Sequence, residues 1–125
     1  MVNILGQHSI TLPFNAEATL TKRYAVKKGT ADNGMIAPTA ITDIPLGILV
    51  DSGVSGDHLA VCVFGECEGI SGAAVTAGTW LTIDNTGRLV PAASTSYPLA
   101  LCLEAAGTAD RYMKVFVNPT GVVKA

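Results

Sequence analysis

The residue types of a hydrolase triad lie together in one short stretch, GVSGDH, with Ser55, Asp57 and His58. A nucleophile elbow needs a glycine two positions before and two positions after the serine, but here Gly56 follows the serine directly. A triad is also brought together from separate elements, whereas these residues share one segment. Gly, Ser and Asp are typical of tight turns, in which their side chains bond nearby backbone amides. We therefore interpret residues 53–58 as a turn and expect no enzyme.

Two acids, Glu66 and Glu68, are two positions apart. In a strand this spacing puts both side chains on one face. Such a pair can act as general acid and base, or bind a cation. No further acid lies near them in sequence, so a solvated strand face is the simpler interpretation.

Three cysteines, Cys62, Cys67 and Cys102, lie in or beside apolar runs. We interpret them as buried free thiols, which behave as small hydrophobic side chains. A Cys62–Cys102 bridge stays open as an alternative. A zinc site needs about four ligands at short spacings, and no such set is present. Phosphate loops and cofactor motifs are also absent from the sequence, so we expect neither a metal nor a cofactor.

A basic cluster carries half of the eight Lys and Arg residues within seven positions: Lys22, Arg23, Lys27 and Lys28. It can be a solvated strand end or a docking patch for an acidic protein surface. Nucleic acid is a weaker option, because Tyr24 is the only aromatic residue within positions 22–28 and stacking surfaces normally offer several rings.

The elements that position these residues are expected to be strands. Residues 17–28 alternate between apolar and polar types, which predicts a strand with one wet face. Residues 79–92 predict two strands joined by a turn at 84–87, and Trp80 is interpreted as a core or interface anchor. With 13 glycines, 6 prolines and weak helical periodicity, the chain is expected to be mainly β, a small sandwich or barrel. Short helical turns are predicted at 71–77 and 104–109.

An internal duplication is indicated by two similar strand-turn-strand units, residues 44–70 and 97–123. At an offset of 53 residues Pro45 falls on Pro98 and Asp57 on Asp110. His58 then falls on Arg111, which favours turn geometry over catalysis. We expect one β-rich domain over 17–125, preceded by an extended N-terminal arm over 1–16.

The bulk composition bounds the function. Charged residues are 14% and hydrophobic residues 49% of the chain, which is too apolar for a disordered protein. So little charge predicts surface hidden against other subunits. The net charge of −2 gives no indication of a nucleic-acid partner, and no apolar run approaches the ~20 residues of a membrane helix. The first ten residues lack the features of a signal peptide, so we expect a protein made and kept in a cytosol.

Three segments then carry a resemblance: AVTAGTWL (74–81), the DNTG turn (84–87) and LALCLEAAGTADRYMKVFV (99–117). Together they are similar to the capsid decoration proteins of tailed bacteriophages, also called cement or head-stabilising proteins. The similarity covers roughly residues 26–118, and it departs from the family pattern at Leu99-Ala100, where a glycine is usual.

The resemblance implies a structural virion protein on the outer surface of the phage head, synthesised in the bacterial host cytoplasm. It implies a homotrimer that bridges major capsid protein subunits, with no reaction and no nucleic-acid or membrane partner. We expect the arm and the basic cluster to contact the capsid, through Ile10, Leu12, Phe14, Lys22, Arg23, Lys27 and Lys28.

Two other functions stay open. The first is a carbohydrate- or receptor-binding β module on a virion surface, although aromatic residues are only 6% of the chain and sugar sites usually use exposed rings. The second is a small hydrolase, for which loss of activity in Ser55→Ala would be the test.

Overall fold

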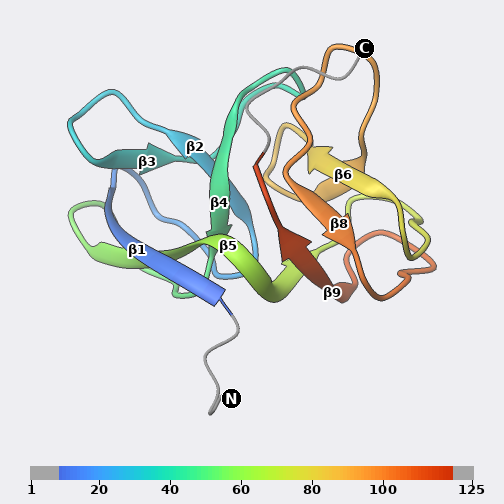
Figure 1. The fold of residues 1–125 in the computed structure, drawn as a ribbon. Helices are drawn as coiled ribbons and strands as arrows, with labels where there is room; N and C mark the ends of the chain where they lie inside the picture. Colours follow the sequence, from blue (N-terminus) through green and yellow to red (C-terminus); the bar gives the residue numbers. More distant parts are fainter. Residues whose placement is uncertain (1–8, 120–125) are drawn as a thin grey trace.

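A computed structural model describes residues 9–119, and the chain over this range is built from strands and turns without a helix (Figure 1). No helix in this range is therefore long and apolar enough to cross a membrane. The strands are β1 (Ser9–Ala16), β2 (Ala25–Lys28), β3 (Gly34–Ile36), β4 (Pro45–Leu49), β5 (His58–Ile70), β6 (Trp80–Ile83), β7 (Leu89–Pro91), β8 (Ala100–Cys102) and β9 (Tyr112–Val117).

The first five strands close into a barrel. Neighbouring strands follow the order β1-β3-β2-β4-β5, and a further pairing between β1 and β5 completes the ring. Only the β1–β3 pair is parallel; the other pairs of the ring are antiparallel. Closure satisfies the backbone groups that an open edge would leave unpaired. The prediction of a mainly β, barrel-like domain is confirmed.

The remaining four strands extend the sheet away from the barrel in the order β9-β8-β6-β7. The long strand β5 joins the two parts. Its first half pairs with β1 and β4, and its second half pairs with β9, from Gly65↔Val117 to Ile70↔Tyr112. In Figure 1, β5 curves between the barrel and the right-hand part of the molecule, which contains β6, β8 and β9.

Two hydrophobic cores lie on opposite faces of the shared strands. Leu49 and Val61 belong to a cluster that draws on all five barrel strands, whereas their neighbours Ile48 and Cys62 belong to a second cluster with β6, β8 and β9. All four side chains have at most 1% of their surface exposed. Because both faces of these strands are covered, they show no alternation between polar and apolar residues.

The strand predicted over residues 17–28 is shorter than expected. Only Ala25–Lys28 form a strand, and the segment before it is a loop with a turn in which the Tyr24 N–H donates to the Thr21 carbonyl oxygen. Arg23 in this loop has a positive φ of 74°, which ends extended structure there. Val26 is fully buried, as its position on the predicted apolar side requires, but Ala25, at a position of the predicted wet side, is fully buried as well.

The predicted helical turns at 71–77 and 104–109 are wrong. These two segments pair with each other instead, through an isolated antiparallel bridge between Val75 and Ala106. Each of these residues donates its N–H to the other's carbonyl oxygen, at 2.8 and 3.1 Å. The N–H groups of Val75 and Ala106 are therefore bonded across the bridge and not within a helical turn.

The predicted arm over residues 1–16 needs correction. Residues 9–16 are strand β1, which pairs with β5 from Ser9↔Gly65 to Asn15↔His58 and with β3 at Asn15↔Gly34. This strand closes the barrel, so it belongs to the domain. Residues 1–8 lie outside the described residues.

Both predicted units contain an antiparallel pair of strands, β4–β5 in the first and β8–β9 in the second. Strands β5 and β9 also pair with each other, so the units lie side by side. Residues 120–123 of the second unit lie outside the described residues. The duplication itself stays a prediction.

Candidate interaction surface

The Ser55, Asp57 and His58 segment is a turn, as predicted. The Asp57 carboxylate accepts a hydrogen bond of 2.9 Å from the Val54 N–H. Gly56 has a positive φ of 96°, and its N–H donates to the Ala16 carbonyl oxygen at 2.8 Å. These bonds give the aspartate and the glycine a local structural role in the turn that leads into β5.

The two acids of β5 lie on its exposed face, and each is paired with a base. Glu68 receives a hydrogen bond of 2.9 Å from the Arg23 Nε, and the Arg23 guanidinium lies 4.3 Å from the centre of the Tyr112 ring. Glu66 is 3.8 Å from the Lys114 ammonium. Because Glu66, Glu68 and Lys114 are 42–55% exposed, although Arg23 is only 26% exposed, solvent screens both pairs and they add little to stability. We call Glu66, Glu68, Lys114 and Arg23 the charged strip; it carries two acids and two bases, so its charges balance.

The cysteines are free thiols; Cys62 and Cys102 are buried and Cys67 is half-buried. Strand β5 turns at Gly65, where φ is 108°, and this turn lets Cys62 and Cys67 pack against one core cluster. The hydrogen bond to Cys62, together with burial, raises the pKa of Cys67. Burial raises the pKa of Cys102. Both thiols are therefore protonated and poorly nucleophilic at neutral pH. Residues 9–119 hold no group of three or more His, Cys, Asp or Glu side chains placed to bind a metal.

The predicted basic cluster is divided among separate contacts. Arg23 pairs with Glu68, and the Lys27 ammonium bonds the Asp43 carboxylate at 3.0 Å. The Lys28 ammonium donates to the Gly29 carbonyl oxygen at 2.9 Å. Of these four basic residues, only Lys22 has a side chain that is exposed and has no such partner among residues 9–119.

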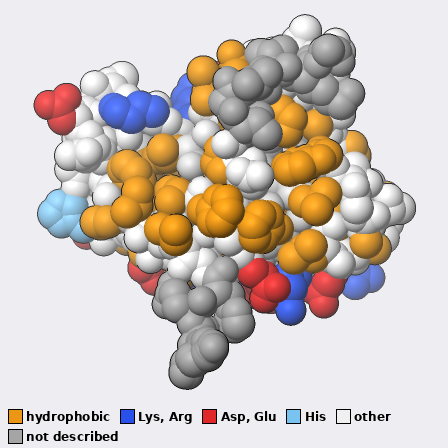
Figure 2. Space-filling model, viewed as in Figure 1, with side chains coloured by type: hydrophobic (Ala, Val, Ile, Leu, Met, Phe, Trp, Pro, Cys, Tyr) orange, Lys and Arg blue, Asp and Glu red, His pale blue; other side chains and the backbone are white. Residues whose placement is uncertain are grey.

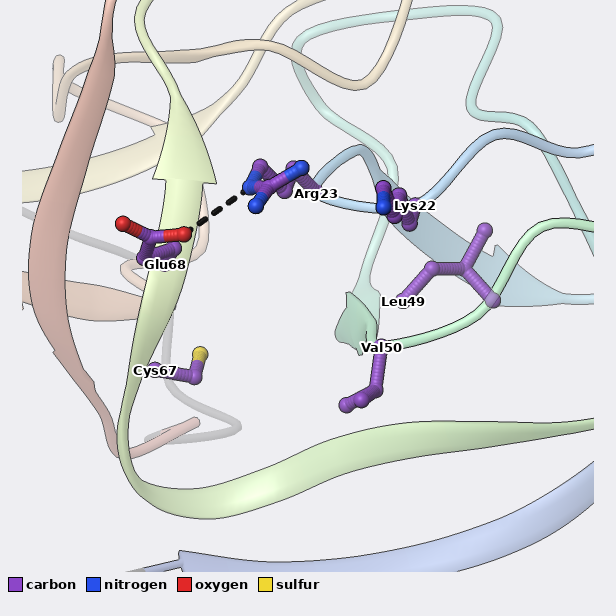
Figure 3. Close-up of a pocket in the computed structure, with 6 residues that line it drawn as sticks. All are labelled: Lys22, Arg23, Leu49, Val50, Cys67 and Glu68. Atoms are coloured by element: carbon purple, nitrogen blue, oxygen red, sulfur yellow. Dashed lines mark hydrogen bonds and ion pairs between the residues drawn. The ribbon is translucent and has the colours of Figure 1, made fainter.

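A shallow pocket of about 210 Å³ lies beside this cluster (Figure 3). Its wall combines the Lys22 and Arg23 side chains with the thiol of Cys67 and the carboxylate of Glu68. Figure 3 shows the Arg23 guanidinium turned toward Glu68, so the two charged groups that face each other already neutralise one another. The pocket offers no buried, unpaired polar group to a ligand.

The most distinctive surface is a row of apolar side chains that crosses five strands. Trp80 on β6 is paired with Leu101 on β8, and Leu101 is paired with Phe116 on β9. The Phe116 ring meets the Phe64 ring of β5 edge to face, with centroids 5.2 Å apart. Phe64 in turn is paired with Ile10 on β1. We call these five side chains the apolar row.

The apolar row is open to solvent. Ile10 is 56% exposed, Phe64 44% and Trp80 39%. Figure 2 shows apolar side chains spread across the face that carries β1, β5, β9 and β8. With roughly 200 Å² for a large side chain, these three alone leave roughly 300 Å² of exposed surface. A patch of that size on a small protein commonly marks an interaction site.

Phe116 lies on the outward-facing side of β9, where a half-buried strand usually carries polar side chains. In β9 the residues Met113, Val115 and Val117 are buried, whereas Tyr112, Lys114 and Phe116 point outward. Sequence reasoning missed Phe64, Leu101 and Phe116. The alternation in YMKVFV is the signal that could have placed Phe116 on the wet face.

The predicted apolar contacts on β1 have different environments. Ile10 belongs to the apolar row, and Leu12 is 46% exposed. Phe14 is half-buried and packs against the barrel core, with Leu59 directly opposite in the β1–β5 register. Two of these three side chains are thus available to a partner.

Residues 4–118 match the family model of a phage cement protein. The chain belongs to the phage cement protein family. The resemblance to phage decoration proteins is thereby confirmed, and the cement family gives the chain a capsid-associated structural role in the virion.

A solved structure with a similar fold is the N-terminal base of the head fibre protein gp8.5 of bacteriophage phi29. It superposes with a TM-score of 0.69 at 17% identity, over 87% of this chain and 93% of that one. At this identity the likeness shows a common fold for the cement protein and the fibre base. No curated protein matches this cement protein in sequence.

Proposed function

We propose that this cement protein binds the outer surface of the phage head as a homotrimer and stabilises the capsid by bridging major capsid protein subunits. The observation that carries the proposal is the match to the cement family over residues 4–118, which is nearly the whole chain. The low charge content supports it, because assembly with other copies and with the capsid hides much of a small surface.

The proposed mechanism is mechanical. A protein that binds the assembled shell, and not its separated subunits, adds its binding free energy to the shell alone. A trimer presents the same contact three times, so weak individual contacts hold together by avidity. The closed barrel and the two cores provide a rigid body, which loses little conformational entropy when it binds.

Lys22 is the basic residue that we propose as a capsid contact. Its side chain is exposed, whereas Arg23, Lys27 and Lys28 already have partners within the chain. An exposed ammonium next to an acidic capsid surface speeds association and makes binding weaker at high salt. Among the apolar side chains, Leu12 stays a proposed capsid contact, because it is exposed and lies outside the apolar row.

The test of bridging is the stability of heads assembled without the protein. Adding it should raise the temperature at which the heads lose subunits, and the rise should saturate with occupancy. Lys22→Gln should weaken head binding at low salt, whereas Arg111→Gln removes the same charge at an exposed position outside the proposed contacts and should not. Heads that bind the protein without any gain in thermal stability would contradict bridging.

A further inference from the structure

We propose that the apolar row, made of Ile10, Phe64, Trp80, Leu101 and Phe116, is buried against a second copy of this chain. The inference rests on the proposed homotrimer and identifies the surface at which its copies meet. Four arguments support a second copy as the partner: the chemistry of the row, its charged border, its area and the timing of assembly.

The chemistry of the row suits a permanent contact between like subunits. Its five members, on β6, β8, β9, β5 and β1, are all apolar; on β5 the residue directly opposite Phe116 is Glu66, which borders the row, and Phe64 meets the Phe116 ring from two positions away. Non-obligate interfaces are about as polar as the rest of the protein surface, whereas the interfaces of homo-oligomers are more apolar. Large rings such as Trp80, Phe64 and Phe116 are the side chains that dominate the binding energy at the centre of a contact.

The charged strip beside the row is compatible with self-association. It contains two acids, Glu66 and Glu68, and two bases, Lys114 and Arg23. Where the strips of neighbouring copies come close around the axis of a trimer, groups of identical charge approach one another, so a strip of a single sign would repel its copies there. This strip is balanced, and the acids of one copy can face the bases of the other.

The exposed area fits the centre of a contact. A standard interface buries about 800 Å² on each partner. The roughly 300 Å² left open by Ile10, Phe64 and Trp80 supplies the apolar centre, and the charged strip supplies part of the polar border.

The timing of assembly also favours a second copy over the capsid. An open apolar row of this kind causes aggregation if it stays uncovered. Other copies are present as soon as the chain is made, whereas a capsid surface becomes available only after heads assemble. A row that a second copy covers keeps the protein soluble in the interval.

Light scattering on purified protein tests the inference with a matched pair of variants. Wild-type protein at micromolar concentration should have three times the 12.8 kDa mass of one chain. Phe116→Glu should reduce the mass to 12.8 kDa, whereas Val54→Glu should not. Val54 is 57% exposed in the turn before β5, so the control adds the same charge at an exposed apolar position away from the row. A monomeric wild-type protein, or a folded Phe116→Glu protein that keeps the wild-type mass, overturns the inference.

Trp80 gives a second measurement that needs no folded variant. It is the only tryptophan of the chain, and it is part of the row. Dilution that dissociates the wild-type oligomer should move the tryptophan emission to longer wavelength and increase its quenching by acrylamide. A fall in mass with no change in the Trp80 emission places the contact elsewhere and overturns the inference.

Co-sedimentation with phage heads separates this inference from the proposed function. Oligomers that form through the row but stay in the supernatant support the inference and refute capsid binding. Monomeric wild-type protein that sediments with heads refutes the inference and supports capsid binding. Protection of Trp80 only when heads are present identifies the capsid as the partner of the row and also refutes the inference.

Discussion

Asp43 holds the loop between β3 and β4 against strand β2, and its replacement by asparagine should have a pH-dependent effect on stability. Its Oδ2 accepts hydrogen bonds from the Thr39 N–H at 2.7 Å, the Ala40 N–H at 3.0 Å and the Lys27 ammonium at 3.0 Å. The Thr39 N–H is the largest cause that lowers the pKa of Asp43, from an ordinary 3.8 to about 2.

The magnitude follows from this change of pKa. A fall from 3.8 to about 2 corresponds to roughly 2 kcal/mol of stability at neutral pH. The side chain is 21% exposed, so solvent screening reduces this value only modestly. Because the pKa in the folded protein lies below that in the unfolded chain, the stabilisation is complete above pH 3.8 and is lost as the pH falls to about 2.

Urea unfolding of wild type and Asp43→Asn at a series of pH values measures the effect. At neutral pH the variant should be less stable by roughly 2 kcal/mol, and the difference should close as the pH falls from 3.8 to about 2. Asp51→Asn is the control, because the exposed Asp51 side chain has no hydrogen bond or ion pair among the described residues. A difference that stays constant over this pH range, or an equal loss in Asp51→Asn, would refute the reasoning.

Three further perturbations test the fold. Gly87→Ala should lower the free energy of unfolding in urea by about 2 kcal/mol or more, because φ is 96° and the new Cβ would lie 2.6 Å from the Ala25 carbonyl oxygen. The control Gly107→Ala places its Cβ in open space and should be nearly neutral. Equal losses in the two variants would contradict this reasoning. Deleting residues 2–16 should abolish the cooperative thermal transition, since the barrel loses β1. An unchanged melting temperature would show that these residues are an arm outside the domain, as the sequence predicted. Replacing all three cysteines by serine should lower stability by roughly 1–3 kcal/mol for each buried hydroxyl and leave co-sedimentation with heads unchanged. Loss of co-sedimentation in a folded variant would indicate a functional thiol.

Local turn chemistry was readable from the sequence. The turn at 84–87 forms as predicted: the Asp84 carboxylate accepts hydrogen bonds from the N–H groups of Thr86 and Arg88, at 2.8 and 2.9 Å, and Gly87 takes a positive φ. In the turn at 53–58 the aspartate lies at the other end, where the Asp57 carboxylate accepts a hydrogen bond from the Val54 N–H three residues before it. Such turns are determined by a few adjacent residues, so a short segment is sufficient to predict them.

Strand β1 carries a local signal that the sequence reasoning missed, because Ile10, Leu12, Phe14 and Ala16 occupy every second position of SITLPFNA. Its place in the barrel was not readable, because its partners β3 and β5 are distant in sequence. The length of β2 was overestimated for a different reason. Residues on both of its faces are buried, and the polar pattern of the preceding loop was taken as a continuation of the strand.

The candidate site was even less accessible to sequence reasoning. The apolar row takes one residue from each of five strands, and the two rings in contact, Phe64 and Phe116, are far apart in the chain. Only the register of the sheet brings them together. The basic cluster, in contrast, is close in sequence, but the fold divides it among separate partners.

Sedimentation with phage heads tests the central claim most directly. Heads of the protein's own phage, assembled without it, are mixed with purified protein and centrifuged. The account predicts that the protein moves into the pellet with the heads, reaches saturation at a fixed number of copies per capsid subunit, and is released at high salt. Protein that stays in the supernatant at every concentration, with heads shown to be intact, would contradict a capsid-binding role.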